Sequence, residues 1–132
     1  MTLTIGRLLR EALWAPAAIV ALNVVVAWLP DPGYLWSLLH FLGGAAAAFC
    51  VFQIAGIAAP ELRALRYVFA FALACTTALA WELGEFAIDQ LAGTALQEGR
   101  VDTMSDLMLS VCGAALFLAF AAITAWKAPA AR

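Results

Sequence analysis

The chain has 132 residues, a mean hydropathy of +0.96 and only 12% charged residues, against about 25% in an ordinary soluble domain. Its net charge is −2, and it has neither a Lys/Arg cluster nor a Gly-rich phosphate loop, so nucleic-acid binding and nucleotide hydrolysis find no support. Apolar runs of roughly the 20 residues that a membrane-crossing helix needs fill nearly the whole length. The sequence therefore predicts a single all-α transmembrane domain over residues 1–132.

Four apolar runs follow one another along the chain. The first, approximately residues 12–29, begins like a signal peptide but continues into "AWLPDPG" without a small-x-small cleavage site, so we expect a membrane anchor. The others cover approximately 34–58, 64–90 and 103–126. Pro or Gly residues mark the breaks "PDPG" (30–33), "APELR" (59–63) and "AGTALQEGRV" (92–101). These short breaks predict an antiparallel bundle of four transmembrane helices.

The basic residues predict the orientation of this bundle. Six of the seven fall on one side of the topology, and Arg100 falls on the other; the six are Arg7, Arg10, Arg63, Arg66, Lys127 and Arg132. By the positive-inside rule the basic side is cytoplasmic. We therefore expect a multi-pass protein of a bacterial-type cytoplasmic (inner) membrane, with both termini inside and the first and third breaks outside.

The carboxylates gather in one part of the chain, since six of the nine lie within residues 81–108: Glu82, Glu85, Asp89, Glu98, Asp102 and Asp106. The first three share one helix face, because spacings of three and seven residues stay within an arc of about 60°. The last two are four residues apart and share a face at the start of the fourth run. Because both groups lie toward the outer ends of their helices, we expect them to meet at one level.

His40 is the only histidine, and it lies about two turns into the second run, which also begins outside. We therefore expect the imidazole at the depth of the acids of the third and fourth runs. Its helix face also carries Gly43, Gly44 and Ala47, small residues that let a neighbouring helix come close. The sequence thus predicts one site shared by three helices.

Carboxylates inside a membrane are costly unless they are paired or hydrated, and Arg100 and His40 are the cationic partners available on the outer side. A divalent cation would neutralise them, and imidazole with carboxylates suits Zn²⁺, Mn²⁺, Fe²⁺ or, with added waters, Mg²⁺ or Ca²⁺. Protonation is the alternative, because like charges and a low dielectric both favour the neutral carboxyl group.

The predicted metal ligands are His40, Glu82, Glu85, Asp89, Asp102 and Asp106. Three of them, Glu82, Glu85 and Asp106, are also the predicted catalytic groups and the expected inner wall of a water-accessible pocket that opens outward. Other roles stay open for the outer acids. Asp102 is well placed to cap the fourth helix, and Asp89 can simply face water.

The string "EFAIDQLAGTALQEGRVDTMSDLMLSVCGA" resembles the core of the YjdF-like small integral membrane proteins and, more distantly, of the VanZ-like family. The resemblance rests on the acids of the third run, Gly93, Gln97 and the "DTxxD" of residues 102–106. "LLHF" around His40 is similar to the "HF" of VanZ-like proteins, whereas Ser110 stands where an Asn is usual. The resemblance implies a multi-helix membrane protein with a polar intramembrane site. For VanZ-like members it implies an association with glycopeptide resistance and the cell envelope.

Three functions remain open. The first is a metal-dependent membrane hydrolase or transferase, or a binding protein, that acts on a lipid or cell-envelope headgroup, where a metal would activate water and polarise an ester. The second is a cation or proton transport component, for which so small a bundle would need to oligomerise. The third is a structural or assembly subunit of a membrane complex. The expected partners are membrane lipids, together with further copies of the chain or a subunit of a membrane complex.

Overall fold

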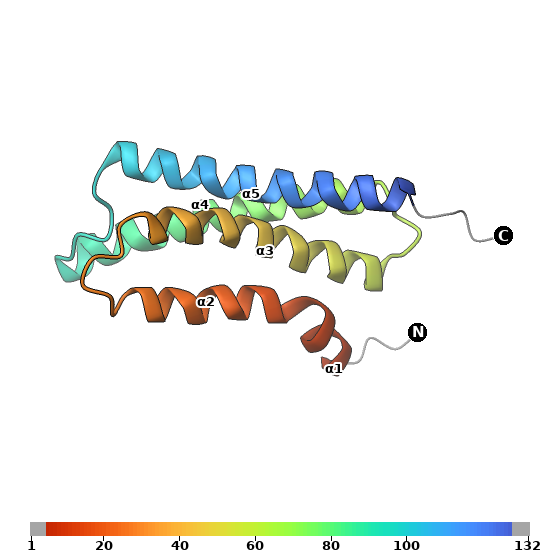
Figure 1. The fold of residues 1–132 in the computed structure, drawn as a ribbon, viewed down its shortest axis with the longest axis horizontal. Helices are drawn as coiled ribbons and strands as arrows, with labels where there is room; N and C mark the ends of the chain where they lie inside the picture. Colours follow the sequence, from red (N-terminus) through yellow and green to blue (C-terminus); the bar gives the residue numbers. More distant parts are fainter. Residues whose placement is uncertain (1–4, 128–132) are drawn as a thin grey trace.

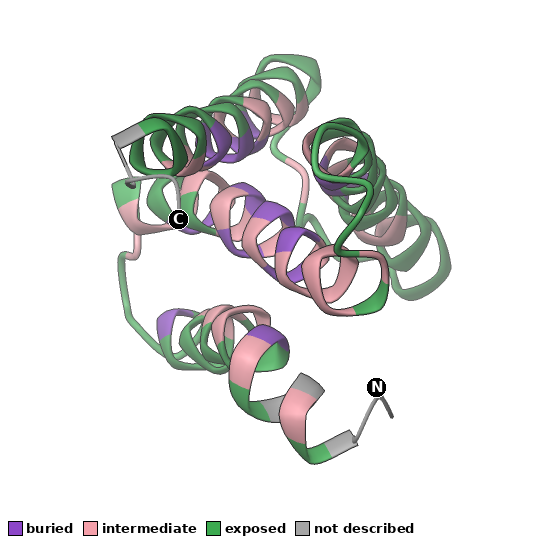
Figure 2. Cartoon of the chain, turned by 90° about the vertical axis from the view of Figure 1, so that its right-hand side faces the viewer, coloured by how far each residue is buried: buried purple, intermediate pink, exposed green. Residues whose placement is uncertain are grey.

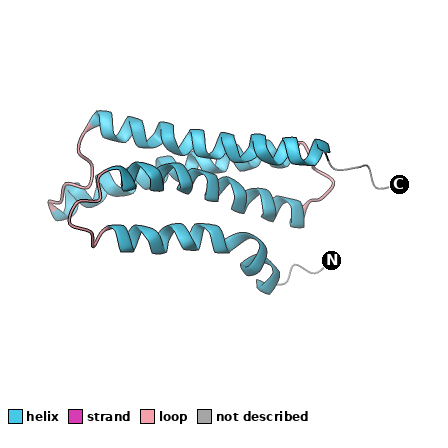
Figure 3. Ribbon diagram, viewed as in Figure 1, coloured by secondary structure: helices cyan, strands magenta, loops and turns pink. Residues whose placement is uncertain are grey.

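The computed structural model describes residues 5–127, which form helices and loops with no strand in that range (Figure 3). The elements are α1 (Ile5–Leu8), the π-helical turn η1 (Leu9–Leu13), α2 (Trp14–Val26), α3 (Tyr34–Ala58), α4 (Leu65–Ala92) and α5 (Arg100–Lys127). The predicted all-α bundle is confirmed. The second, third and fourth apolar runs agree with α3, α4 and α5 to within three residues at each end.

Helix α3 is the centre of the bundle. It packs against α2, α4 and α5, and α4 and α5 also pack against each other (Figure 1). Buried and half-buried positions line α3 and the faces turned toward it, whereas the outer faces are exposed (Figure 2). Large apolar side chains such as Val68, Leu83 and Phe120 lie on those outer faces. By length and composition α3, α4 and α5 can each cross a membrane, and their apolar outer surfaces suit contact with lipid.

The first predicted span differs from the structure. Regular helix α2 has 13 residues, about 20 Å at 1.5 Å per residue, against a hydrocarbon core of about 30 Å. Pro16 lacks the N–H that would bond the carbonyl of Ala12, and its ring crowds that carbonyl. The π-helical turn η1 lies directly before α2, and the chain bends there (Figure 1). Residues 27–29 form a turn. That this first segment crosses the membrane stays a prediction.

The two ends of the bundle differ in charge. The start of α1, the loop 59–64 and the end of α5 lie at one end, and the loops 27–33 and 93–99 lie at the other (Figure 1). The arginines before α2 and those around the loop 59–64 therefore share one end, as the topology required, while Arg132 falls outside the described residues. The assignment of that end to the cytoplasm stays a prediction.

Two glycines bring α3 and α5 into backbone contact. A Cβ at Gly44 would overlap the backbone of Ser110, and a Cβ at Gly113 would overlap the carbonyl of Phe41. The Ser110 hydroxyl also donates to the backbone oxygen of His40 at 3.1 Å. This contact confirms the expectation that the small face beneath His40 admits a neighbouring helix. His40 and Asp106 each lie one turn before the residues of this contact, Gly44 and Ser110, so the contact places His40 opposite Asp106.

The loop 93–99 closes the acidic end between α4 and α5. Gly93 ends α4 in the left-handed conformation (φ 69°), and its N–H donates to the carbonyl of Asp89 at 3.0 Å. Gly99 also has a positive φ, 131°, immediately before α5. Glycine reaches these conformations without the steric cost that a side chain adds. The loop can therefore turn back over the acids of both helices.

Candidate functional site

The imidazole of His40 lies between two carboxylates from two other helices. Its Nδ1 is 3.7 Å from Oε1 of Glu82 on α4, and its Nε2 is 3.4 Å from Oδ2 of Asp106 on α5. The side chains of His40, Glu82 and Asp106 are 14%, 4% and 11% exposed. The predicted meeting of the histidine with acids of the third and fourth helices is confirmed. Among residues 5–127 these three form the one group whose ligand atoms all lie within 4.8 Å of one another.

The two carboxylate oxygens of Glu82 differ, because Oε2 accepts a hydrogen bond and Oε1 accepts none from the described residues. The side-chain amide of Gln97 donates to Glu82 Oε2 at 3.1 Å and to the Glu82 backbone oxygen at 3.0 Å. Oε1 is buried and has no hydrogen-bond partner among the described residues. Its 3.7 Å separation from the His40 nitrogen is longer than the usual 2.7–3.2 Å of an N–H···O bond. The centre of the site thus contains an unsatisfied buried acceptor.

Glu85 lies one turn beyond Glu82, outside the three-residue group. The indole N–H of Trp81 donates to Glu85 Oε1 at 2.7 Å. Glu85 therefore stands at the margin of the site with one oxygen held.

Asp89 anchors the loop between α4 and α5. Its Oδ1 accepts hydrogen bonds from the Thr94 hydroxyl at 2.6 Å and the Leu96 amide at 2.8 Å, and its Oδ2 accepts one from the Gln97 amide at 3.0 Å. Asp89 does not belong to the His40 group. Both of its oxygens are used to hold the backbone from which the Gln97 side chain reaches Glu82.

Asp102 lies in the first turn of α5, and its Oδ2 accepts a hydrogen bond from the Glu98 amide at 3.1 Å. It too lies outside the three-residue group. A carboxylate that accepts a backbone N–H and lies at the positive end of a helix stabilises that helix start. Because α5 begins at Arg100, Asp102 is not the N-cap that the sequence left open; its carboxylate instead holds the Glu98 amide just before the helix.

Gln97 and Ser110 contact the site residues but were not among the predicted site residues. Ser110 is one turn after Asp106 on the same face of α5, and that spacing could have predicted that Ser110 lies beside the site. Gln97 is different, because its position depends on the path of the loop 93–99, which hydrophobic periodicity does not describe.

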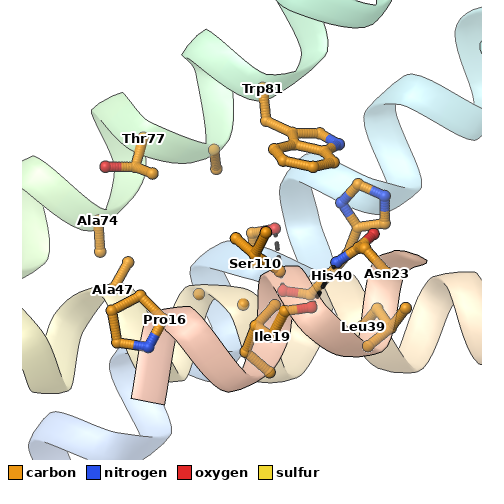
Figure 4. Close-up of a pocket in the computed structure, with 14 residues that line it drawn as sticks. Pro16, Ile19, Asn23, Leu39, His40, Ala47, Ala74, Thr77, Trp81 and Ser110 are labelled. Atoms are coloured by element: carbon orange, nitrogen blue, oxygen red, sulfur yellow. Dashed lines mark hydrogen bonds between the residues drawn. The ribbon is translucent and has the colours of Figure 1, made fainter. Parts of the chain in front are cut away.

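A cleft of about 140 Å³ reaches His40 between α2 and α4, above α3 (Figure 4). Its walls are mostly apolar: Pro16, Ile19, Val20 and Asn23 on α2, and Ala74, Thr77, Ala78 and Trp81 on α4. The pocket expected from the sequence had Glu82, Glu85 and Asp106 as its wall, but none of these lines this cleft. The cleft lies between helices α2, α3 and α4 and meets the site at the imidazole and the indole of Trp81.

The three side chains suit a divalent cation in number and type. With metal–ligand distances of about 2.0–2.2 Å, the ligand atoms of a tetrahedral site stand about 3.3 Å apart. One ligand atom from each of His40, Glu82 and Asp106 lies within 4.8 Å of the other two, which is about 1.5 Å wider than that spacing. Three protein ligands with one open position are typical of catalytic zinc sites.

A family model described as "Predicted membrane protein (DUF2238)" matches residues 14–127. The match runs from α2 to the end of α5 and includes every residue of the site. It confirms the YjdF-like resemblance, since that family is the same one, and it does not extend to the VanZ-like proteins. Neither a curated protein nor a solved structure matches the chain.

Proposed function

The chain belongs to the DUF2238 family of membrane proteins, and we propose that it binds a divalent cation through His40, Glu82 and Asp106 in order to bind or act on a lipid or cell-envelope headgroup. The observation that carries this proposal is Glu82 Oε1, which is buried, faces the imidazole and has no hydrogen-bond partner in the described part of the chain. A buried acceptor without a donor costs about 1–3 kcal/mol, and a charged one more. A cation held by these three side chains removes that cost.

Each side chain has a separate role in this proposal. His40, Glu82 and Asp106 supply one nitrogen and two oxygen ligands and leave one position for a water or a headgroup oxygen. When bound, the cation supplies Lewis acidity and lowers the pKa of a bound water. Glu85, with one oxygen on the Trp81 indole and the other free of any hydrogen bond to the described residues, is the proposed general base. Gln97 orients Glu82, and Asp89 holds Gln97.

The apolar cleft supports a lipid as the bound molecule. It lies between α2 and α4 within the apolar part of the chain and ends at His40, so an acyl chain in it would bring its polar end to the site. We propose membrane lipids as the partners and a bacterial-type cytoplasmic membrane as the location. The cell-envelope part of the proposal rests on the "HF" at His40 alone, through its distant VanZ-like resemblance.

A proton-transfer role is the second candidate, and one observation favours it. Both ring nitrogens of His40 face a carboxylate, Nδ1 toward Glu82 and Nε2 toward Asp106. An imidazole in this position can accept a proton on one nitrogen and release one from the other. This arrangement would serve a cation or proton transport component as well as a metal site.

The two candidates separate in a melting experiment in detergent. The melting temperature is measured against Zn²⁺, Mn²⁺, Mg²⁺ and Ca²⁺ for the parent, Glu82→Gln, Asp106→Asn and the control Glu98→Gln, which removes an exposed acid at the same end. We expect one of the cations to stabilise the parent and the control, by about 2.7 kcal/mol at 100 times its Kd, and not the other two variants. If none does so, and the amide variants are as stable as the parent, the metal site is rejected in favour of proton transfer.

A further inference from the structure

The basic end of the bundle has a cleft of its own. Arg63, Arg66 and Tyr67 line it together with Gly56, Pro60 and Ala125. It lies where α3 ends, α4 begins and α5 approaches its last turn, at the end of the molecule opposite the acidic loops (Figure 1). It therefore shares no residue with the His40 site.

The guanidinium of Arg66 contacts two aromatic rings beside this cleft. Its guanidinium carbon lies 4.0 Å from the centre of the Phe52 ring and 5.6 Å from that of Tyr67. Phe52 is itself buried in the helix core, and its ring packs edge-on against the ring of Tyr67 at 4.9 Å. An Arg side chain stacked in this way presents the planar edge of its guanidinium in one direction.

The same guanidinium lacks an acceptor. Arg66 Nε is buried without a hydrogen-bond partner, and neither Arg63 nor Arg66 forms an ion pair within residues 5–127. Arg7 at the same end is different, because it pairs with Glu11 at 3.0 Å. As far as the described residues go, the cleft thus contains two positive charges and a buried donor without a negative partner.

The orientation rule alone does not account for this arrangement. Positive charge beside a loop is sufficient to favour the cytoplasmic side, and the exposed Arg10 supplies it without burial. Burying an N–H donor without an acceptor adds a free-energy cost that a bound anion would offset. The start of α4, where Ala64 offers no side-chain cap, adds the positive end of a helix dipole nearby.

We propose that this cleft binds the phosphate group of an anionic phospholipid. Arg66 would bind the phosphate oxygens through its planar edge, and the exposed Arg63 would bind from the rim. A lipid is the source that fits the location, because the cleft lies at the ends of three membrane-crossing helices. Among the described residues no carboxylate lines the cleft, which favours a headgroup of net negative charge over one that carries its own cation.

The test measures melting temperature in detergent with chelator present, so that it is independent of the His40 site. Short-chain phosphatidylglycerol, phosphatidylcholine and inorganic phosphate are each titrated into the parent, Arg66→Gln, Arg63→Gln and the control Arg10→Gln. We expect phosphatidylglycerol to stabilise the parent and the control. Its apparent affinity should fall by about tenfold or more in Arg66→Gln and by less in Arg63→Gln.

Three results would overturn the proposal. One is equal stabilisation by phosphatidylcholine, and another is an equal rise with inorganic phosphate at the same concentration, which would make the ligand a soluble anion. The third is that Arg66→Gln and Arg63→Gln respond as Arg10→Gln does. If Arg66→Gln does not fold, Arg66→Lys, which keeps the charge without the planar fork, and Arg63→Gln, at an exposed position, decide the same question.

Discussion

Two acids of α4 differ in how their carboxylates are held. Glu82 and Asp89 lie seven residues apart on one helix face. Asp89 accepts three hydrogen bonds from the loop 93–99, so both of its oxygens are satisfied. Glu82 is more deeply buried, and its Oε1 has no hydrogen-bond partner within residues 5–127. Both residues thus carry a carboxylate on the same helix face, and the difference lies in what completes their hydrogen bonds.

The two acids are also linked, because Asp89 bonds the backbone of Gln97 and the side chain of Gln97 bonds Glu82. The outer region, Asp89 and the loop 93–99, therefore supports the inner region, His40, Glu82 and Asp106, without contributing a side chain to it. Four substitutions test this division between the two regions, and their expected effects decrease from Gly44→Ala to Asp102→Asn.

The largest effect is expected from Gly44→Ala, which acts on the helix contact beneath the inner region. The added Cβ meets the backbone of Ser110, which cannot rotate away, so we expect destabilisation beyond the usual 1–3 kcal/mol or so of overpacking, and loss of the His40 to Asp106 approach. Gly84→Ala is the matched control, because nothing lies within 4 Å of its Cβ, and it should be neutral or stabilising. Equal melting temperatures for the two variants would contradict the close contact of α3 and α5.

Gln97→Ala should act next most strongly, and mainly on the inner region. It removes the donor that orients Glu82 Oε2, and loss of such a ligand-orienting bond lowers metal affinity by about 10- to 100-fold. The affinity is read from cation titrations of the melting temperature. Gln90→Ala removes an exposed amide near the end of α4 and should leave it unchanged. Equal cation affinities for Gln97→Ala and Gln90→Ala would mean that Gln97 does not position Glu82.

Asp89→Ala should loosen the outer region and leave the cation response in place. We expect hydrogen exchange at the Leu96 and Gln97 amides to accelerate on the order of tenfold, because both lose their acceptor. The melting temperature should still rise at saturating cation. Asp31→Ala, at an exposed position in the loop 27–33, serves as the control for exchange. Loss of the cation response with unchanged exchange would show that Asp89 is a ligand.

The smallest effect is expected from Asp102→Asn. Asparagine accepts a backbone N–H at a helix start about as well as aspartate, so stability should change by no more than about 0.5 kcal/mol. Cation titration should match that of the parent. If the melting temperature of Asp102→Asn no longer rose with cation, Asp102 would be a metal ligand, as the sequence predicted.

The sequence was sufficient for the helices and for the depth of the site. Long apolar runs between Pro and Gly breaks placed α3, α4 and α5, and the common depth of His40 and the acids placed the cluster. Gly44 also predicted the close helix contact. These features follow from helical periodicity and bilayer thickness, which the residue order alone determines.

The remaining differences arise from local and tertiary detail. Pro16 lies early in the first apolar run, and hydropathy does not register the π-helical turn before it. Helical periodicity correctly put Asp89 on the same face as Glu82. The loop 93–99 folds back, however, and donates hydrogen bonds to both carboxylate oxygens of Asp89. The same loop supplies Gln97 to Glu82, and a loop path of this kind is set by contacts that no helical pattern encodes.

The central proposal is that the inner region, His40, Glu82 and Asp106, binds a divalent cation, and the metal content of the purified protein tests this most directly. Elemental analysis is made on protein purified in detergent, before and after chelator, for the parent, Glu82→Gln and Asp89→Asn. We predict about one divalent cation per chain in the parent and in Asp89→Asn, removed by chelator, and little in Glu82→Gln. A parent that retains no cation even after incubation with Zn²⁺, Mn²⁺, Mg²⁺ or Ca²⁺, or a Glu82→Gln variant that retains as much as the parent, would contradict the claim.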